Sequence, residues 1–224
     1  TNTVMKSIGN IYLAWRAGTG KRRHIVGVIR RNVTLGTRFA YISNNIQEAM
    51  RDGFTCYTDF PDLDKEYSDG VLEKFGQRLT KPDREDIQEY YNFWNIKDEY
   101  KNDKYYLLAH TQGLLATDNY EFLAEYRPVK GLSFVSDICG LSHITLGQGD
   151  VNIGDQLTWK KEIGNNYDKY AIQVYKGNRM IGYIKRIHNK VFHNSHSQNI
   201  SLSVKSIVTG VNRIQKIFIV ISIG

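Results

Sequence analysis

The sequence predicts an α+β module at the N-terminus followed by a small all-β barrel of the OB or SH3 type with one short helix. Residues 1–128 mix strand-like runs with helical patterns, whereas residues 129–224 consist almost entirely of strand-like runs. The charge also changes between the two parts. Residues 1–128 hold 18 Lys+Arg and 18 Asp+Glu, but residues 129–224 hold 12 against 5, which accounts for the whole net charge of +7. We therefore expect two domains, 1–128 and 129–224.

The N-terminal module begins with three short alternating or β-branched runs at 11–15, 24–29 and 37–42, which predict a meander. A helix is expected over 44–53, with a side-chain cap before it and with Gly53 at its end. Apolar residues at helical spacing predict a second helix over 71–79. Pro82 and the acids around it predict a third over 80–94, and a fourth is expected over 103–111. A strand over 120–124 leads to the boundary at Pro128.

The C-terminal part contains six strand patterns in fewer than a hundred residues. They lie at 131–138, 156–162, 170–175, 180–184, 200–206 and 214–223, with a short helix expected at about 186–193. The dipeptide Gly177-Asn178 separates two of these runs and is typical of a tight hairpin turn. So many short strands joined by turns predict a small antiparallel barrel.

Composition limits the class of protein. Hydrophobic residues make up 41% and aromatic residues 12%, as in globular chains. The longest apolar run, 214–223, is shorter than the roughly 20 residues that cross a bilayer. With no export signal, and with Cys56 and Cys139 expected as free buried thiols, we expect a cytoplasmic protein without a membrane partner. The basic C-terminal half favours a polyanionic partner over a neutral one.

Several catalytic and metal-binding patterns are incomplete. Residues 17–22 resemble a phosphate-binding loop, but the required first glycine and the hydroxyl after Lys21 are missing, so a basic turn is expected. His188, His193 and His196 do not share a helical face, and the acids of 59–69 are expected to form a solvated turn. No Gly-x-Ser-x-Gly, His-Glu-x-x-His or kinase catalytic-loop motif occurs in the sequence. We expect no catalytic residue, no cofactor and no bound metal.

One ordered set of residues resembles a known family. The set comprises Lys161-Glu162, Asn165-Asn166-Tyr167-Asp168, Ala171-Ile172 and Gly182-Tyr183-Ile184. Over about 130–224 the chain resembles the HIRAN domain, found in fork-remodelling translocases and as bacterial modules. The resemblance implies an OB- or SH3-like barrel that captures single-stranded DNA, particularly a free 3′ end, and with it a context of DNA repair or defence. RNA is the alternative ligand.

The resemblance also implies which residues would bind. Tyr167 and Asp168 match the positions that hold the terminal nucleotide, Tyr183 borders the same pocket, and Arg186 meets phosphate. The family's Arg-Tyr after the first Gly-Leu is replaced here by Ser133-Phe134, which keeps a ring but not the guanidinium. The expected nucleic-acid-binding residues are Phe134, Lys161, Tyr167, Asp168, Tyr183, Lys185 and Arg186. A turn opening a hairpin is the alternative role for Tyr167-Asp168.

A weaker resemblance covers about 10–125. Phe60-Pro61-Asp62, Phe75-Gly-Gln-Arg78-Leu79 and Gly113-Leu-Leu-Ala-Thr-Asp118 are similar to the N-terminal subdomain of HipA-type toxin kinases. Because no kinase body follows, the resemblance implies a protein-docking module and not phosphoryl transfer. The alternative to nucleic-acid binding is therefore a protein-interaction adaptor, or a regulator of the toxin–antitoxin or defence type.

Overall fold

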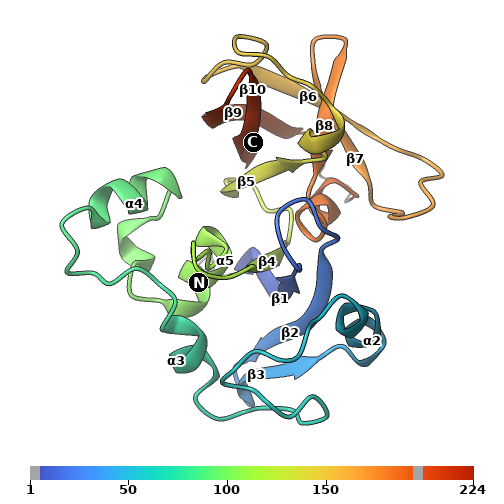
Figure 1. Cartoon of the computed structure of the whole chain (residues 1–224). Coiled ribbons are helices and arrows are strands. Elements are labelled where there is room, and N and C mark those ends of the chain that lie inside the picture. The colour runs from blue at the N-terminus through green and yellow to red at the C-terminus, as the bar shows by residue number, and fades with distance from the viewer. Residues whose placement is uncertain (1–5, 194–198) are drawn as a thin grey trace. The chain divides into compact units, whose positions relative to one another are not determined.

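A computed structural model describes residues 6–193 and 199–224, which cluster into two compact units (Figure 1). One unit is Ile8–Glu125, and the other contains Tyr126–Gly224 together with Lys6 and Ser7. The backbone N–H of Arg127 donates to the carbonyl of Ser7, which ties the start of the chain to the second unit. The domain assignment with a boundary at residue 128 stays a prediction, because spatial clustering does not test whether either part folds alone.

The first unit is built on a four-stranded sheet with the order β3-β2-β1-β4 (Figure 1). Its strands are β1 (Ile8–Trp15), β2 (His24–Asn32), β3 (Gly36–Tyr41) and β4 (Tyr120–Tyr126). The first three form the predicted antiparallel meander. Because a β-strand alternates its side chains, Ile11 and Leu13 turn to the same side of β1, and both are fully buried. The predicted α+β class is confirmed for this part of the chain.

Four α-helices and one 3-10 helix accompany this sheet, and several of them differ from the sequence-based prediction. They are α2 (Ser43–Arg51), α3 (Val71–Gly76), α4 (Ile87–Phe93), η1 (Asp98–Tyr100) and α5 (Lys104–Thr111). α3 is shorter than expected, and η1 was not predicted. α4 begins at Ile87, so the expected helix over 80–94 is wrong in its first half, where turns stand instead. α2 has Ile42 at its N-cap and lacks the expected side-chain cap. The amide of Asn45 instead donates to the carbonyl of Ile25 in β2.

An aromatic cluster orders the long connection between α2 and α3. Phe39 in β3 has its ring centre 5.0 Å from that of Phe60 and 5.0 Å from that of Phe75. Tyr67 adds a short bridge to the open edge of β3, since its backbone N–H and carbonyl both pair with Phe39. The hydroxyl of Tyr41 donates to the carbonyl of Phe60 at 2.6 Å. This packing keeps residues 55–69 against the sheet although they form no helix.

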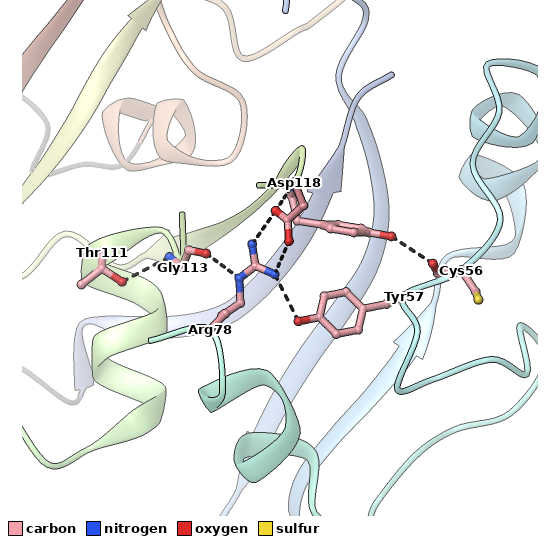
Figure 2. Close-up of polar contacts among 7 residues, drawn as sticks. Cys56, Tyr57, Arg78, Thr111, Gly113 and Asp118 are labelled. Atoms are coloured by element: carbon pink, nitrogen blue, oxygen red, sulfur yellow. Dashed lines mark hydrogen bonds and ion pairs between the residues drawn. The ribbon is translucent and has the colours of Figure 1, made fainter. Parts of the chain in front are cut away.

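Arg78 joins three segments of the first unit (Figure 2). Its side chain is 3% exposed, and its two terminal nitrogens form a bidentate ion pair with Asp118 at 2.8 and 3.1 Å. Its Nε donates to the carbonyl of Gly113, and Nη1 also donates to the hydroxyl of Tyr57 at 3.1 Å. Burial raises the pKa of Tyr57, so this hydroxyl stays protonated at neutral pH. The buried guanidinium therefore connects the end of α3 to the loop after α5 and to the connection after α2.

The second unit is a closed barrel with the strand order β10-β5-β8-β7-β6-β9. Its strands are β5 (Ser133–Cys139), β6 (Gln156–Lys161), β7 (Ile172–Lys176), β8 (Arg179–Ile184), β9 (Ile200–Gly210) and β10 (Arg213–Ile223). All recorded pairings are antiparallel, so the predicted barrel is confirmed. Gly182 has a φ of +152°, and a side chain there would overlap Ile138 and the backbone of Cys139, so glycine permits the contact between β8 and β5.

The barrel contains the predicted short helix and one buried ion pair. The helix is the 3-10 segment η3 (His188–His193), whose Phe192 packs against Trp159 of β6 with ring centres 4.9 Å apart. The amine of Lys185 and the carboxylate of Asp137 lie 2.5 Å apart, and the lysine side chain is 1% exposed. A second 3-10 helix, η2 (Leu141–His143), follows β5. No helix in the described part of the chain is long and apolar enough to cross a membrane.

Candidate nucleic-acid interface

The outer face of β6, β7 and β8 presents two aligned rows of side chains. Strand register places Lys160 opposite Gln173 and Gln173 opposite Tyr183, and all three are at least partly exposed. In the neighbouring row, Thr158 lies opposite Tyr175. The amine of Lys160 is 4.8 Å from the centre of the Tyr175 ring. Because strand alternation sends these side chains to one side, two tyrosines and a cation share this surface.

Glu162 organises this face from the end of β6. Its Oε2 accepts from the amide of Asn165 at 2.6 Å, and its Oε1 accepts from the amide of Gln173 at 3.1 Å and the hydroxyl of Tyr183 at 3.2 Å. Gln173 in turn accepts from the hydroxyl of Tyr175 at 2.8 Å. Burial, followed by the nearby Glu162 carboxylate, raises the pKa of Tyr183. Tyr183 therefore remains a neutral hydrogen-bond donor, and the network holds both rings.

The loop from Ile163 to Tyr170 places one ring in solvent. The side-chain oxygen of Asn165 accepts from the backbone N–H groups of Tyr167 and Asp168, both at 2.8 Å, which fixes an Asx turn. Tyr167 is 93% exposed at the end of this turn. An aromatic ring kept out of the core on a hydrogen-bonded turn is available to a ligand without rearrangement of the loop.

Asp168 lies next to this ring and already holds two partners. Its Oδ1 accepts from the backbone N–H of Tyr170 at 2.9 Å, and its Oδ2 accepts from the amide of Asn189 at 2.8 Å. The second bond joins the Tyr167 loop to η3. The turn-forming role that the sequence left open for Asp168 is therefore present. An ionised carboxylate has about four acceptor positions, so two remain for a ligand.

Cations surround the loop. Lys160, Lys161, Lys169 and Arg186 are exposed, and none of them forms an ion pair with a carboxylate of residues 6–193 or 199–224. By contrast, Lys176 and Arg179 at the other end of the β7–β8 hairpin pair with Asp155 and Asp150. The cations with no fixed counterion therefore gather on the Tyr167 side of the hairpin, where they can neutralise phosphates.

Two of the expected binding residues belong to the core and not to this surface. Phe134 is fully buried in β5 and stacks on Tyr126 with ring centres 4.0 Å apart, so its ring is not accessible to a base. Lys185 forms an ion pair with Asp137 inside the barrel, so its amine is not accessible to a phosphate. The structure instead brings together Lys161, Tyr167, Asp168, Tyr183 and Arg186 around the loop and the adjoining face.

Sequence reasoning also missed residues that shape the surface. Gln173 and Tyr175 were recognised only as part of a strand, and Asn189 only as part of a helix. Strand parity contains a signal for Gln173 and Tyr175, because both alternate with the buried Ile172 and Val174. No comparable signal identifies Asn189, because its bond to Asp168 depends on how η3 packs against the Tyr167 loop.

The histidines and acids that suggested metal sites have other surroundings. Among residues 6–193 and 199–224, no three His, Cys, Asp or Glu side chains converge as metal ligands would. His188 is buried and its Nδ1 lies 2.7 Å from the hydroxyl of Ser136, while a ring nitrogen of His193 lies 2.9 Å from the carbonyl of Tyr170. His196 lies outside the described residues. In the basic turn after β1, Arg22 and Arg23 pair with Glu48 and Glu121.

Comparisons with known proteins find one matching family model and two similar solved structures. The family model described as the HIRAN domain matches residues 131–222. The solved HIRAN domain of human HLTF is 20% identical with a TM-score of 0.31, and the match covers 40% of this chain and 74% of that one. A solved protein from Lactobacillus plantarum is 21% identical with a TM-score of 0.32, covering 42% and 95%. No curated protein sequence matches the chain.

The match confirms the resemblance that the Glu162–Ile184 motif suggested, and it lies within the predicted range of 130–224. The resemblance of about 10–125 to HipA-type kinases stays a prediction. Residues 131–222, which span the six barrel strands from Ser133 as far as Ser222 in β10, match the family model of the HIRAN domain.

Proposed function

We propose that the barrel unit binds single-stranded DNA on the outer face of β6–β8 and the adjoining loop, without catalysing a reaction. The observation that carries this proposal is the ring of Tyr167, which is 93% exposed at the end of a hydrogen-bonded turn. A ring in this position can stack on a base without leaving a packed core. On the same side of the β7–β8 hairpin, Lys160, Lys161, Lys169 and Arg186 are exposed and form no ion pair with a carboxylate of the described residues, so they can neutralise phosphates.

Each part of the surface has a chemical task. The face of Tyr167 stacks a base whatever its identity, which contributes about 1–3 kcal/mol per base. Tyr175 and Tyr183 offer further aromatic surface on the barrel, held by the Glu162 network. Lys160, Lys161, Lys169 and Arg186 supply phosphate contacts, so affinity falls as salt rises. The ligand is single-stranded because a base inside a duplex is already stacked on its neighbours. It must leave that stack before the Tyr167 ring can stack on its face.

We also propose that Asp168 favours a strand with a free 3′ hydroxyl. Phosphate repels a carboxylate, so a carboxylate among cations makes sense where the ligand donates a hydrogen bond. Asn189 and the turn hold the Asp168 carboxylate in place and leave acceptor positions open. A terminal hydroxyl supplies the missing donor.

The experiment is a fluorescence anisotropy titration of a short labelled strand with the full chain. We expect binding at 50 mM salt that weakens steeply as salt rises, and we expect Tyr167→Ala to weaken it by about 5- to 150-fold, the equivalent of one lost stacking contact of about 1–3 kcal/mol. Tyr167→Phe is the matched control, because it keeps the ring, and should bind nearly as wild type. Absence of binding by the wild-type chain at low salt would contradict the proposal.

The same titration tests the end preference with a strand that carries a 3′ phosphate. The wild-type chain should bind it more weakly than the 3′ hydroxyl strand, and Asp168→Ala should reduce that difference. Equal affinities of the wild-type chain for both strands would leave Asp168 as a turn residue only, without affecting the stacking role of Tyr167.

A second candidate function concerns the first unit, for which we propose protein docking. Val33 and Leu35 at the tip of the β2–β3 hairpin are 107% and 56% exposed. The side chain of Asn32 accepts from the backbone N–H groups of Thr34 and Leu35, so the tip has a defined shape. A partner retained after nuclease treatment but lost from Val33→Ser/Leu35→Ser would be bound through this tip and not through DNA.

A further inference from the structure

The β9–β10 hairpin is longer than the barrel wall requires. The two strands pair with each other from Arg213 and Gly210 to Ile223 and Ile200. Within the described residues, β9 pairs with β6 as far as Ser203, and Val204 bonds to the backbone of Gly154 and Asp155. β10 pairs with β5 as far as Phe218. Residues 205–217, which we call the β9–β10 arm, are therefore a two-stranded ribbon that continues past the barrel strands.

The arm is anchored at Ile214, close to its tip, and the turn beyond that residue is exposed. The backbone N–H of Ile214 donates to the carbonyl of Leu146 at 2.8 Å, and η2 packs along β10. In the turn, Asn212 takes a left-handed φ of +58°, next to Val211, which is 88% exposed. Val208 on the adjoining strand is 44% exposed. The tip thus combines a fixed backbone with apolar side chains in solvent.

The charge of the arm has a single sign. Residues 199–224 contain no Asp or Glu, and their three cations, Lys205, Arg213 and Lys216, all lie in the arm. Arg213 is exposed, and neither Arg213 nor Lys216 forms an ion pair with a carboxylate of the described residues. The amine of Lys216 lies 4.8 Å from the ring centre of Phe218, so it stays close to the ribbon surface.

The arm and the Tyr167 loop lie at opposite ends of the barrel strands. β6 runs from Gln156 to Lys161 and ends at the Tyr167 loop. β9 is antiparallel to β6, with Ser203 opposite Gln156, so its tip extends beyond the beginning of β6. A binding site on the arm is therefore distinct from the site at which a nucleotide would stack on Tyr167.

Two kinds of partner are compatible with a basic ribbon that has an exposed tip: a second copy of this chain and double-stranded DNA. Edge-to-edge pairing with a second copy needs a regular open edge, but this hairpin has irregularities between Ile214 and Lys216 and between Phe218 and Ile219, and it places lysines beside them. Bulges and edge lysines are features that oppose such pairing. The major groove of DNA admits a two-stranded ribbon, and its phosphates match the positive charges of Arg213 and Lys216.

We propose that the β9–β10 arm is a second binding site that takes double-stranded DNA. Arg213 and Lys216 contact phosphates across a groove, and the tip around Val211 enters it. The site goes beyond the single-strand proposal, because it uses other residues at the other end of the barrel and needs no strand end.

The test is filter binding of the full chain to a relaxed, covalently closed circular duplex, which has neither strand ends nor single-stranded segments. We expect Arg213→Ala/Lys216→Gln to weaken binding at 100 mM salt by roughly tenfold or more and to lower the slope of log affinity against log salt by about two. Lys81→Ala/Lys130→Ala removes the same charge from exposed positions outside the arm and should bind nearly as wild type.

Further variants separate this site from the Tyr167 surface and from misfolding. Tyr167→Ala should leave circular-duplex binding unchanged, whereas Arg213→Ala/Lys216→Gln should leave short-strand binding nearly unchanged. Val211→Glu places a negative charge at a position with no packing to lose, and it should also weaken duplex binding. The proposal is overturned if the wild-type chain does not retain the circle at 50 mM salt, if the arm variants bind it as wild type, or if the Lys81/Lys130 control weakens it equally.

Discussion

Lys185→Met is expected to lower the free energy of unfolding of the barrel by about 3–5 kcal/mol. The lysine amine lies 2.5 Å from Asp137, and the side chains are 1% and 8% exposed. Methionine fills much of the lysine volume but leaves the Asp137 carboxylate without its cation in the core. A buried charge deprived of its partner costs far more than an exposed ion pair contributes. Urea unfolding followed by the fluorescence of Trp159, the tryptophan of the barrel, measures the change.

Two further variants check this explanation. Asp137→Leu/Lys185→Met removes both charges and should recover most of the lost stability, because no unpaired charge remains. Lys161→Met changes an exposed lysine at the end of β6 and should leave the midpoint almost unchanged. If Lys185→Met were as stable as wild type but bound DNA more weakly, Lys185 would contact the ligand. That result would contradict its assignment to the core.

Arg78→Met is expected to destabilise the first unit by a similar amount, about 3–5 kcal/mol. The side chain is 3% exposed, and its loss removes both bonds to Asp118 as well as those to Gly113 and Tyr57. The rings of Tyr57, Tyr120 and Phe122 also lose the cation, whose central carbon lies 5.1–5.9 Å from their centres. The unfolding transition reported by Trp15 and Trp94 should move to lower urea.

The conservative variant Arg78→Lys tests whether the positive charge alone accounts for the stabilisation. Arg78→Lys keeps the charge but not the planar set of donors, so it should lose most of the same stability. Arg84→Met is the matched control, because Arg84 is exposed and its recorded carboxylate partner, Asp86, is two residues away. A stable Arg78→Met protein would mean that the three segments are held by apolar packing alone.

The barrel was predictable because its signals are local. Alternation of buried and exposed residues along β7 and the Gly177-Asn178 turn predict the β7–β8 hairpin. The Asx turn at Asn165 was equally accessible, since it depends on residues two and three positions apart. These features need no knowledge of distant contacts.

The two misplaced binding residues result from contacts that are distant in the sequence, whereas the misplaced helix start results from local bonds. Lys185 precedes an exposed arginine and resembles a surface cation, but Asp137, 48 positions earlier, holds it inside the barrel. Phe134 follows a glycine-leucine pair like a ligand-binding ring, yet Tyr126 and His188 cover it. The predicted helix over 80–94 was too long because acids and Pro82 favour a first turn, while local bonds such as that of Arg84 to Lys81 form separate turns.

Photochemical crosslinking tests the central claim most directly. A short strand carrying 5-iodouracil is irradiated with the full chain, and the crosslinked tryptic peptides are sequenced. If a base stacks on Tyr167, the principal crosslink will lie in the peptide of residues 162–169, and it will persist in Tyr167→Phe and disappear in Tyr167→Ala. A crosslink confined to residues 8–125, or one in 162–169 that Tyr167→Ala leaves undiminished, would contradict the claim.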